Sequence, residues 1–174
     1  NDFNFTSDQL MIGIDMLENQ GNTKTVDGLI NFSRPTDFLI KINGPEDSRI
    51  LVDAYYDSYY YLYGEKLSMI DKVPENTRKD TGLFNSMYLA LSSELNLPQT
   101  KEVIPFSIYE TGILVEGDGN PEHKEYNSLT DFAIKDGNIE IAVPWQLLNV
   151  MDPSTKRVIG DLYQNSGIEP TSIE

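Results

Sequence analysis

Cysteine is absent from this chain of 174 residues, which excludes disulfide bonds, thiolate metal sites and cysteine nucleophiles. Long hydrophobic runs are also missing, since every apolar stretch falls far short of the roughly 20 residues that span a bilayer. Basic residues are scarce: 13 Lys and Arg stand against 28 Asp and Glu, a formal net charge of −15. We therefore expect no nucleic-acid partner and no insertion of this segment into a membrane.

Apolar and aromatic residues are plentiful enough for a hydrophobic core. They make up 39% of the chain and include 10 Tyr, 7 Phe and 1 Trp, so wholesale disorder is excluded. The length suits one domain over residues 1–174. The chain opens on the polar pair Asn1 and Asp2 without a signal-peptide pattern, and this domain could be a fragment of a larger protein.

Short apolar runs closed by turn residues predict a mostly β chain. The run at 9–15 reads as a strand buried on both faces or nearly so, and 18–27 reads as a loop. The Asp136-Gly137 pair between two apolar runs is the strongest hairpin signal. Further strands are expected at 37–42, 49–53, 87–91, 112–115, 129–134 and 139–143.

Two segments favour helical structure. Tyr55–Tyr63 holds six tyrosines in nine positions and predicts a short helix or an irregular aromatic segment. Asp152-Pro153-Ser154 is typical of a helix start. Its apolar stripe would be Val158, Ile159, Leu162 and Tyr163, with Gly167 and Pro170 ending the helix. Together these patterns predict an antiparallel β-sandwich with long loops and one or two short peripheral helices.

The stretch Ile139–Leu148 is the most informative. Its strand alternates Ile139, Ile141 and Val143 on one face with Glu140 and Ala142 on the other. Pro144 then stops the strand, and we expect Trp145 and the two leucines that follow to fold back under the sheet. Structural roles are therefore expected for Glu140, Pro144 and Trp145.

This stretch resembles the closing strand and turn of the sandwich domains related to family-nine carbohydrate-binding modules and the DOMON superfamily. Ile12–Asp15 with its Asn- and Gly-rich loop, followed by Asp37–Ile42, agrees with that family. Over most of residues 9–160 the chain is similar to a C-terminal sandwich region of Firmicute membrane or envelope proteins, some of which carry a glycosyltransferase-like region. The chain departs from the sugar-binding members in having a single tryptophan instead of a pair.

The resemblance implies a non-catalytic accessory domain, outside a Gram-positive cell, that binds a glycan or interacts with the cell envelope. The implied partners are a glycan ligand and other domains of a parent protein. Two alternatives stay open from the residues: a glycan hydrolase using two carboxylates, and a purely structural domain-docking module. An enzyme is the less expected of these readings.

Catalytic motifs give little support to the hydrolase. His123 is the only histidine and lies in a charged loop, so we expect a surface residue and not a triad member. Glu140 is the carboxylate of most interest, although an alternate strand position is ordinarily the wet face. No glycine-rich loop of the nucleotide-binding type occurs.

Calcium is the one cofactor that the residues suggest. Hard oxygen ligands gather in two glycine-containing loops, and Ca²⁺ takes six to eight such oxygens. The alternative is that these residues form solvated acidic turns without a metal ion. The candidate ligands are Asp15, Glu18 and Asn22 in the first loop, with Asp118 and Asn120 in the second.

The tyrosine segment offers a further binding surface. Tyrosine presents a flat apolar face with a polar tip, which suits stacking against a sugar ring. The candidate ligand-binding residues are Tyr55, Tyr56, Tyr59 and Tyr60. The alternative is a rigid aromatic cover over the sandwich, or a contact with a neighbouring domain.

Overall fold

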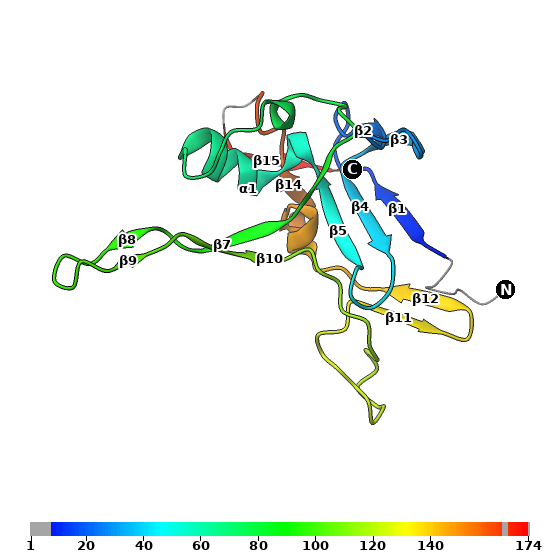
Figure 1. Cartoon of the computed structure of the whole chain (residues 1–174). Coiled ribbons are helices and arrows are strands. Elements are labelled where there is room, and N and C mark those ends of the chain that lie inside the picture. The colour runs from blue at the N-terminus through cyan, green and yellow to red at the C-terminus, as the bar shows by residue number, and fades with distance from the viewer. Residues whose placement is uncertain (1–7, 165–166, 174) are drawn as a thin grey trace.

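The computed structural model describes residues 8–164 and 167–173, and it is mostly β with antiparallel strand pairing (Figure 1). This confirms the predicted fold class. A second sandwich layer is not confirmed: beside one four-stranded sheet, the described strands form five separate sheets of two or three strands. Among the described residues, no helix combines the length and the apolarity needed to cross a bilayer.

The four-stranded sheet is the centre of the molecule and has the strand order β1-β4-β5-β6. Strands β4 and β5 lie in the middle of the sheet, and most of their apolar residues are buried. They pair as an antiparallel hairpin, with Phe38 opposite Val52. The bounds are β1 (Leu10–Ile14), β4 (Phe38–Ile42), β5 (Arg49–Asp53) and β6 (Phe84–Ser86).

Small antiparallel sheets surround this centre. The Asp136-Gly137 hairpin forms as predicted, with positive φ angles of 51° and 76° that suit its two turn residues. The pairs are β2 (Asn22–Lys24) with β3 (Asn31–Thr36), β7 (Tyr88–Ser92) with β10 (Ser107–Glu110), β8 (Leu95–Asn96) with β9 (Val103–Ile104), and β11 (Phe132–Lys135) with β12 (Asn138–Ile141). A three-stranded sheet joins β13 (Val150–Asp152), β14 (Arg157–Ile159) and β15 (Pro170–Ser172).

Helical structure is short and concentrates in the tyrosine segment, as predicted. Gly64 lies against the ring of Tyr60, and a Cβ at this position would be 3.0 Å from that ring, so a larger residue would require the ring to shift. The helical elements are the 3-10 turns η1 (Ala54–Tyr56), η3 (Pro74–Thr77), η4 (Trp145–Leu148) and η5 (Pro153–Thr155), the α-helical turn α1 (Ser58–Tyr60) and the π-helical turn η2 (Tyr61–Lys66).

The predicted C-terminal helix is wrong. Asp152 does cap a turn, since its carboxylate accepts hydrogen bonds from the backbone and hydroxyl of Ser154. The turn is only η5, and it ends at Lys156, which has a left-handed φ of 53°. Val158 and Leu162 are buried as their apolar pattern requires, but from a strand and a turn. Pairing of β14 with β13 and β15 outweighs the local helix signal.

Three further predictions, two about strands and one about a loop, need correction. The segment 112–115 forms a single bridge between Ile113 and Arg49 instead of a strand. Residues 22–24 of the predicted loop form β2, because Asn22 and Lys24 pair with β3. Strand β1 is half-buried instead of shielded on both faces, since it is an edge strand paired with β4 alone.

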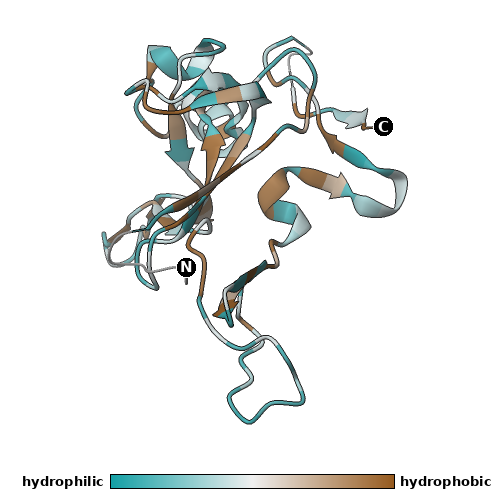
Figure 2. Cartoon of the chain, turned by 90° about the vertical axis from the view of Figure 1, so that its right-hand side faces the viewer, coloured by the Kyte–Doolittle hydropathy of each residue, from teal (hydrophilic) through white to brown (hydrophobic). Residues whose placement is uncertain are grey.

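The hydrophobic core lies between the four-stranded sheet and the segments that fold back on it. Figure 2 shows the hydrophobic colour along the strands of the sheet, whereas the loop that hangs below it is largely hydrophilic. The core centre consists of Leu17, Phe38, Ile40, Ile42, Ile50, Val52, Tyr56, Tyr61, Leu114, Phe132, Val158 and Leu162.

The closing motif is only partly as predicted. Leu147 and Leu148 pack against the core, as expected. Trp145 does not, because its side chain in η4 is 58% exposed. Pro144 ends the extended segment and precedes η4, and Glu140 is exposed opposite Ala133. The two leucines supply the apolar contact that the turn requires, so the indole is left facing solvent.

Candidate functional site

A buried polar cluster, formed by Gln20, Asn22, Asp37 and Asp53, lies at one end of the β4–β5 hairpin. Asp37 directly precedes β4 and Asp53 ends β5, so the antiparallel register brings them together. The backbone N–H of Asp53 donates to the carbonyl of Asp37 at 2.7 Å. All four side chains are buried, and Asn22, Asp37 and Asp53 have no exposed surface. Carboxylates reach the interior only when partners compensate for their lost hydration.

Asp37 fastens the segment after β1 to the sheet. One carboxylate oxygen, Oδ2, accepts hydrogen bonds from the backbone N–H groups of Met16 (2.7 Å) and Leu17 (2.9 Å). The other, Oδ1, accepts from Nε2 of Gln20 at 3.1 Å. Burial raises the pKa of Asp37 above its ordinary value, against the opposing effect of these three donors.

Asn22 joins Asp53 to a third part of the chain. Its Nδ2 donates to Oδ1 of Asp53 and to the carbonyl of Leu83, each at 2.9 Å. Its Oδ1 accepts from the backbone N–H of Gly82 at 2.7 Å. One amide side chain therefore connects β2, the end of β5 and the loop before β6. Asn22 has no exposed surface and its amide is held by these bonds within the fold, apart from the exposed Asp15 and Glu18 with which it was expected to bind calcium.

Asp53 is a buried carboxyl group with a raised pKa. Burial, reinforced by the nearby charges of Asp37 and Asp80, raises its pKa to about 7. Its Oδ1 also accepts from the backbone N–H of Tyr55 at 3.3 Å. Its Oδ2 is buried and has no hydrogen-bond partner among the described residues, and the same is true of Oε1 of Gln20. The cluster can therefore hold a proton, but its carboxylates are closed off from any substrate.

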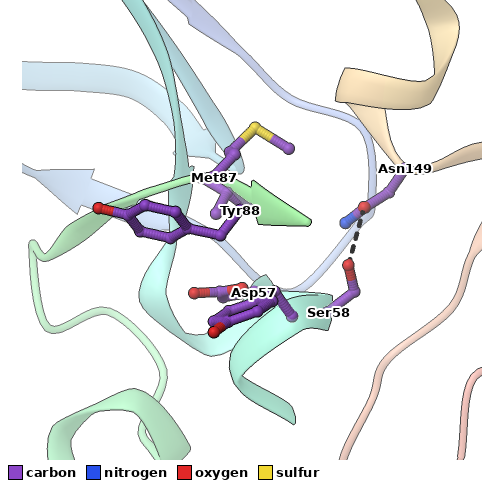
Figure 3. Close-up of a pocket in the computed structure, with 7 residues that line it drawn as sticks. Asp57, Ser58, Met87, Tyr88 and Asn149 are labelled. Carbon is purple, nitrogen blue, oxygen red and sulfur yellow. Dashed lines mark hydrogen bonds between the residues drawn. The ribbon is translucent and has the colours of Figure 1, made fainter. Parts of the chain in front are cut away.

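A small pocket lies between the tyrosine segment and β7 (Figure 3). Asp57 and Ser58 line it from one side, Met87 and Tyr88 from the second, and Asn149 from the third. The hydroxyl of Ser58 donates to Oδ1 of Asn149 at 3.4 Å. The cavity volume of about 20 Å³ admits roughly one water molecule and excludes a sugar ring.

Asp57 serves the fold at the wall of this pocket. Its Oδ1 caps the following helical turn by accepting from the backbone N–H of Tyr60 at 3.0 Å. Its Oδ2 accepts from Nδ2 of Asn85 at 2.9 Å, which ties the turn to β6. Burial raises the pKa of Asp57. Both carboxylate oxygens of Asp57 accept hydrogen bonds, so this side chain caps the helical turn and joins it to β6.

The predicted stacking tyrosines do not form an exposed platform. Tyr55, Tyr56 and Tyr60 are buried, with 5%, 0% and 4% of their surface exposed. The hydroxyl of Tyr55 donates to Asp161 at 2.7 Å, and that of Tyr56 donates to the carbonyl of Ile159. Burial raises the pKa of both hydroxyls. These rings anchor the chain around residues 159–161 to the core, which is the aromatic cover that the sequence left as the alternative.

Tyr59 is the one of the four that is only half-buried. Its ring lies 5.1 Å from the ring of Tyr63 and 5.7 Å from that of Tyr88, measured between centroids. Tyr63 in turn lies 5.6 Å from Phe106. The tyrosine segment therefore packs on the base of the strands β7 and β10 through these aromatic contacts.

The candidate calcium ligands do not assemble. Among the described residues, no three His, Asp or Glu side chains are placed so that they could hold a metal ion. Asp15 and Glu18 are exposed, separate from the enclosed Asn22. Asp118 and Asn120 are occupied within their own loop: Asp118 accepts from Nδ1 of His123 at 2.7 Å and from the backbone of Asn120. His123 is exposed, as predicted.

A strand pair projecting from the molecule has the opposite character to the cluster. We call residues 88–110 the ribbon: β7 pairs with β10 at its base and β8 with β9 toward its tip (Figure 1). Seven of the 19 large apolar residues that are exposed in the described chain lie on it. They are Leu89, Leu91, Leu95, Val103, Ile104, Ile108 and Tyr109.

Sequence reasoning missed both the cluster and the ribbon. Asp37 and Asp53 lie at strand ends, where a carboxylate is ordinarily solvated, and burial becomes visible only when the two ends meet. For the ribbon, the short apolar run at Met87–Leu91 predicted a strand but not that its apolar side chains would lack a cover. Comparisons with models of protein families, with curated proteins and with solved structures found no match.

Proposed function

We propose that this chain is a non-catalytic accessory domain of a cell-envelope protein, and that it binds a partner through the ribbon. The observation that carries the proposal is the concentration of exposed apolar side chains on residues 88–110. Exposed apolar patches of this kind mark interaction surfaces in soluble proteins. A two-stranded ribbon is also only marginally stable alone in water, so a partner that covers it supplies stability that the pair lacks.

The position of the carboxylates supports a role without catalysis. A glycan hydrolase requires two carboxyl groups on either side of an open cleft. Asp37 and Asp53, the two carboxyl groups of the buried polar cluster, have no exposed surface and accept hydrogen bonds from backbone N–H groups and amides. Their hydrogen bonds maintain the end of the central sheet. The location outside a Gram-positive cell rests on the family resemblance of the sequence.

Carbohydrate binding is the second candidate, and one observation favours it. The indole of Trp145 is 58% exposed, and an exposed aromatic face can stack on the apolar side of a sugar ring. A site at Trp145 would lie in η4 and not on the tyrosine segment. The two candidates therefore involve different residues and can be separated by substitution.

Retention of the labelled domain on isolated Gram-positive cell envelopes tests the proposal. The ribbon variant carries Leu89→Thr, Leu91→Thr and Tyr109→Thr, which keep residues that favour strands. The matched control carries Leu29→Thr and Leu129→Thr, because these leucines are 82% and 72% exposed outside the ribbon. We expect retention to fall at least tenfold in the ribbon variant and to stay within twofold in the control.

The remaining arms separate the alternatives. Loss of retention in Trp145→Ala alone, together with a signal on a glycan array, would replace the proposal with carbohydrate binding. Release of reducing sugar ends from envelope glycans would overturn the non-catalytic role. Equal retention of all variants would overturn the role of the ribbon. Equal thermal unfolding midpoints confirm that each variant is folded.

A further inference from the structure

We propose that the partner is an extended segment of another polypeptide, apolar on one face and carrying lysine or arginine, which adds to the edge of the ribbon as a further strand. This inference rests on the proposed function, since it specifies what the ribbon binds. Three features of the ribbon carry it: open backbone edges, the apolar surface formed by Leu89, Leu91 and Tyr109, and carboxylates near the tip that none of the described ion pairs includes.

Both strand pairs of the ribbon have open edges. Strand β7 pairs only with β10, and β8 only with β9, so within the described residues each of these strands keeps one edge without a neighbouring strand. Such an edge presents unpaired N–H and C=O groups and can act as a template for another strand. Strand addition at an edge takes its affinity from main-chain hydrogen bonds and its specificity from alternate side chains.

Contacts with the rest of the chain hold the base of the ribbon in place, so the open edge there is already ordered before a partner binds. Tyr88 contacts Tyr59, and Phe106 contacts Tyr63, at centroid distances of 5.7 and 5.6 Å. Arg49 of β5 also bonds Glu110 at the end of β10, with 3.0 Å between Nε and Oε1. A partner strand therefore does not have to order the base of the ribbon when it binds.

The apolar face follows from the register. Leu89 lies directly opposite Tyr109, and Leu91 is the next residue of β7 on the same face. The three side chains are 55%, 59% and 62% exposed, in the order Leu89, Tyr109, Leu91. An added strand with apolar residues at alternate positions would extend this face and cover part of it.

Charge determines which kind of strand fits. Between residues 88 and 109 the charged side chains are Glu94, Lys101 and Glu102, and none of the described ion pairs includes them. The chain as a whole carries −15. A strand with basic side chains is attracted by the whole domain and meets two carboxylates near the tip. A second copy of this chain would bring the same carboxylates and the same net charge together, which opposes self-pairing.

Binding of three synthetic ten-residue peptides tests the inference. The first alternates valine and lysine, the second alternates valine and glutamate, and the third is the lysine peptide with two central valines replaced by proline. The third keeps the charge but cannot pair as a strand, because proline lacks the N–H. Fluorescence anisotropy gives the affinities, and amide hydrogen exchange locates the binding on the chain.

We expect the valine–lysine peptide to bind at least tenfold more tightly than either of the others and to slow exchange in β7 or β10. The variant with Leu89→Thr, Leu91→Thr and Tyr109→Thr should lose at least tenfold in affinity, whereas Leu29→Thr with Leu129→Thr should stay within twofold. Glu94→Gln with Glu102→Gln should weaken binding and reduce its salt dependence.

Other results would overturn the inference. Equal binding of the proline peptide would mean simple charge attraction. Equal binding by the ribbon variant would place the site elsewhere. A concentration-dependent dimer lost only in the ribbon variant would make a second copy the occupant. If no peptide binds while retention on envelopes still depends on the ribbon, strand addition fails and the proposed function stands.

Discussion

The buried polar cluster and the ribbon reverse the usual distribution of side chains. At the end of the β4–β5 hairpin, two carboxylates and two amides lie inside the protein, whereas on the ribbon leucine, isoleucine, valine and tyrosine face solvent. The comparison distinguishes side chains that stabilise this chain from side chains that can contact another molecule. The cluster is enclosed and hydrogen-bonded, so its polar groups stabilise this chain. The ribbon is open, so its apolar groups are available to another molecule.

Loss of the Asn22 amide should produce the largest effect. Asn22→Ala leaves Asp53 Oδ1, the Leu83 carbonyl and the Gly82 N–H without this partner. We expect the free energy of unfolding to fall by about 4 kcal/mol. Urea denaturation measures it. The control Asn138→Ala, at the exposed start of β12, should change stability by less than about 0.5 kcal/mol. Similar losses in the free energy of unfolding for both variants would contradict a stabilising role of the cluster.

The protonation of Asp53 gives the second prediction. Its pKa rises from an ordinary value near 4 to about 7 on folding, so the folded state keeps a proton that the unfolded state releases. Its contribution is fully present below pH 4 and is lost as the pH rises to 7. We therefore compare the free energies of unfolding of Asp53→Asn and the wild type at the two pH values. Between pH 4 and pH 8 their difference should shift in favour of the variant by about 3–4 kcal/mol.

Denaturation at a series of pH values checks this sign. The exposed Asp71→Asn serves as the matched control and should follow the wild-type curve. The raised pKa values of Asp37 and Asp57 act in the same direction, so Asp53→Asn should keep part of the wild-type pH dependence. A wild-type and an Asp53→Asn curve that run parallel from pH 4 to pH 8 would contradict the prediction.

A pair of leucines sharpens the contrast between core and ribbon. Leu114 has no exposed surface, whereas Leu91 is 62% exposed. Leu114→Ala should lower the free energy of unfolding by about 3 kcal/mol, through lost burial and the cavity that remains. Leu91→Ala should lower it by less than about 0.5 kcal/mol. Urea denaturation of the two variants provides the measurement. A large loss in Leu91→Ala would show that the ribbon face supports the fold.

The smallest effect is expected within the ribbon itself. Leu89→Thr with Leu91→Thr exchanges two exposed apolar residues for a residue that favours strands, so stability should stay within about 0.5 kcal/mol of the wild type. Binding of an apolar fluorescent dye should decrease in the same variant. The control Leu29→Thr, outside the ribbon, should leave dye binding on residues 88–110 intact. Unchanged dye fluorescence in the ribbon variant would mean that the apolar face is covered in solution.

Local patterns predicted the elements whose cause is local. Asp136 and Gly137 specify their turn through positive φ angles, and the apolar run in β4 specifies a buried strand. The helix expected after Asp152 failed for the same reason: its capping group forms as predicted, but the strand partners of β14 lie at residues 150–152 and 170–172. Local propensity does not include those distant partners.

The site was less predictable than the fold, because it depends on which distant segments meet. Asn22 was interpreted as a calcium ligand on its residue type, yet its hydrogen bonds to residues 53, 82 and 83 enclose it. Trp145 was expected to fold back beneath the sheet together with the two leucines that follow it, and here the leucines pack on the core while the indole is exposed. The resemblance to carbohydrate-binding sandwiches stays a prediction.

The spacing of the Asn22 contacts has a consequence for the order of folding. These hydrogen bonds join residues 31, 60 and 61 positions apart in the chain, whereas the β4–β5 hairpin closes across a short turn. Closing a long loop costs more chain entropy before any contact rewards it, so we expect the hairpin to form early and the Asn22 bonds to form after the rate-limiting step. Weakening those bonds should then speed unfolding far more than it slows folding.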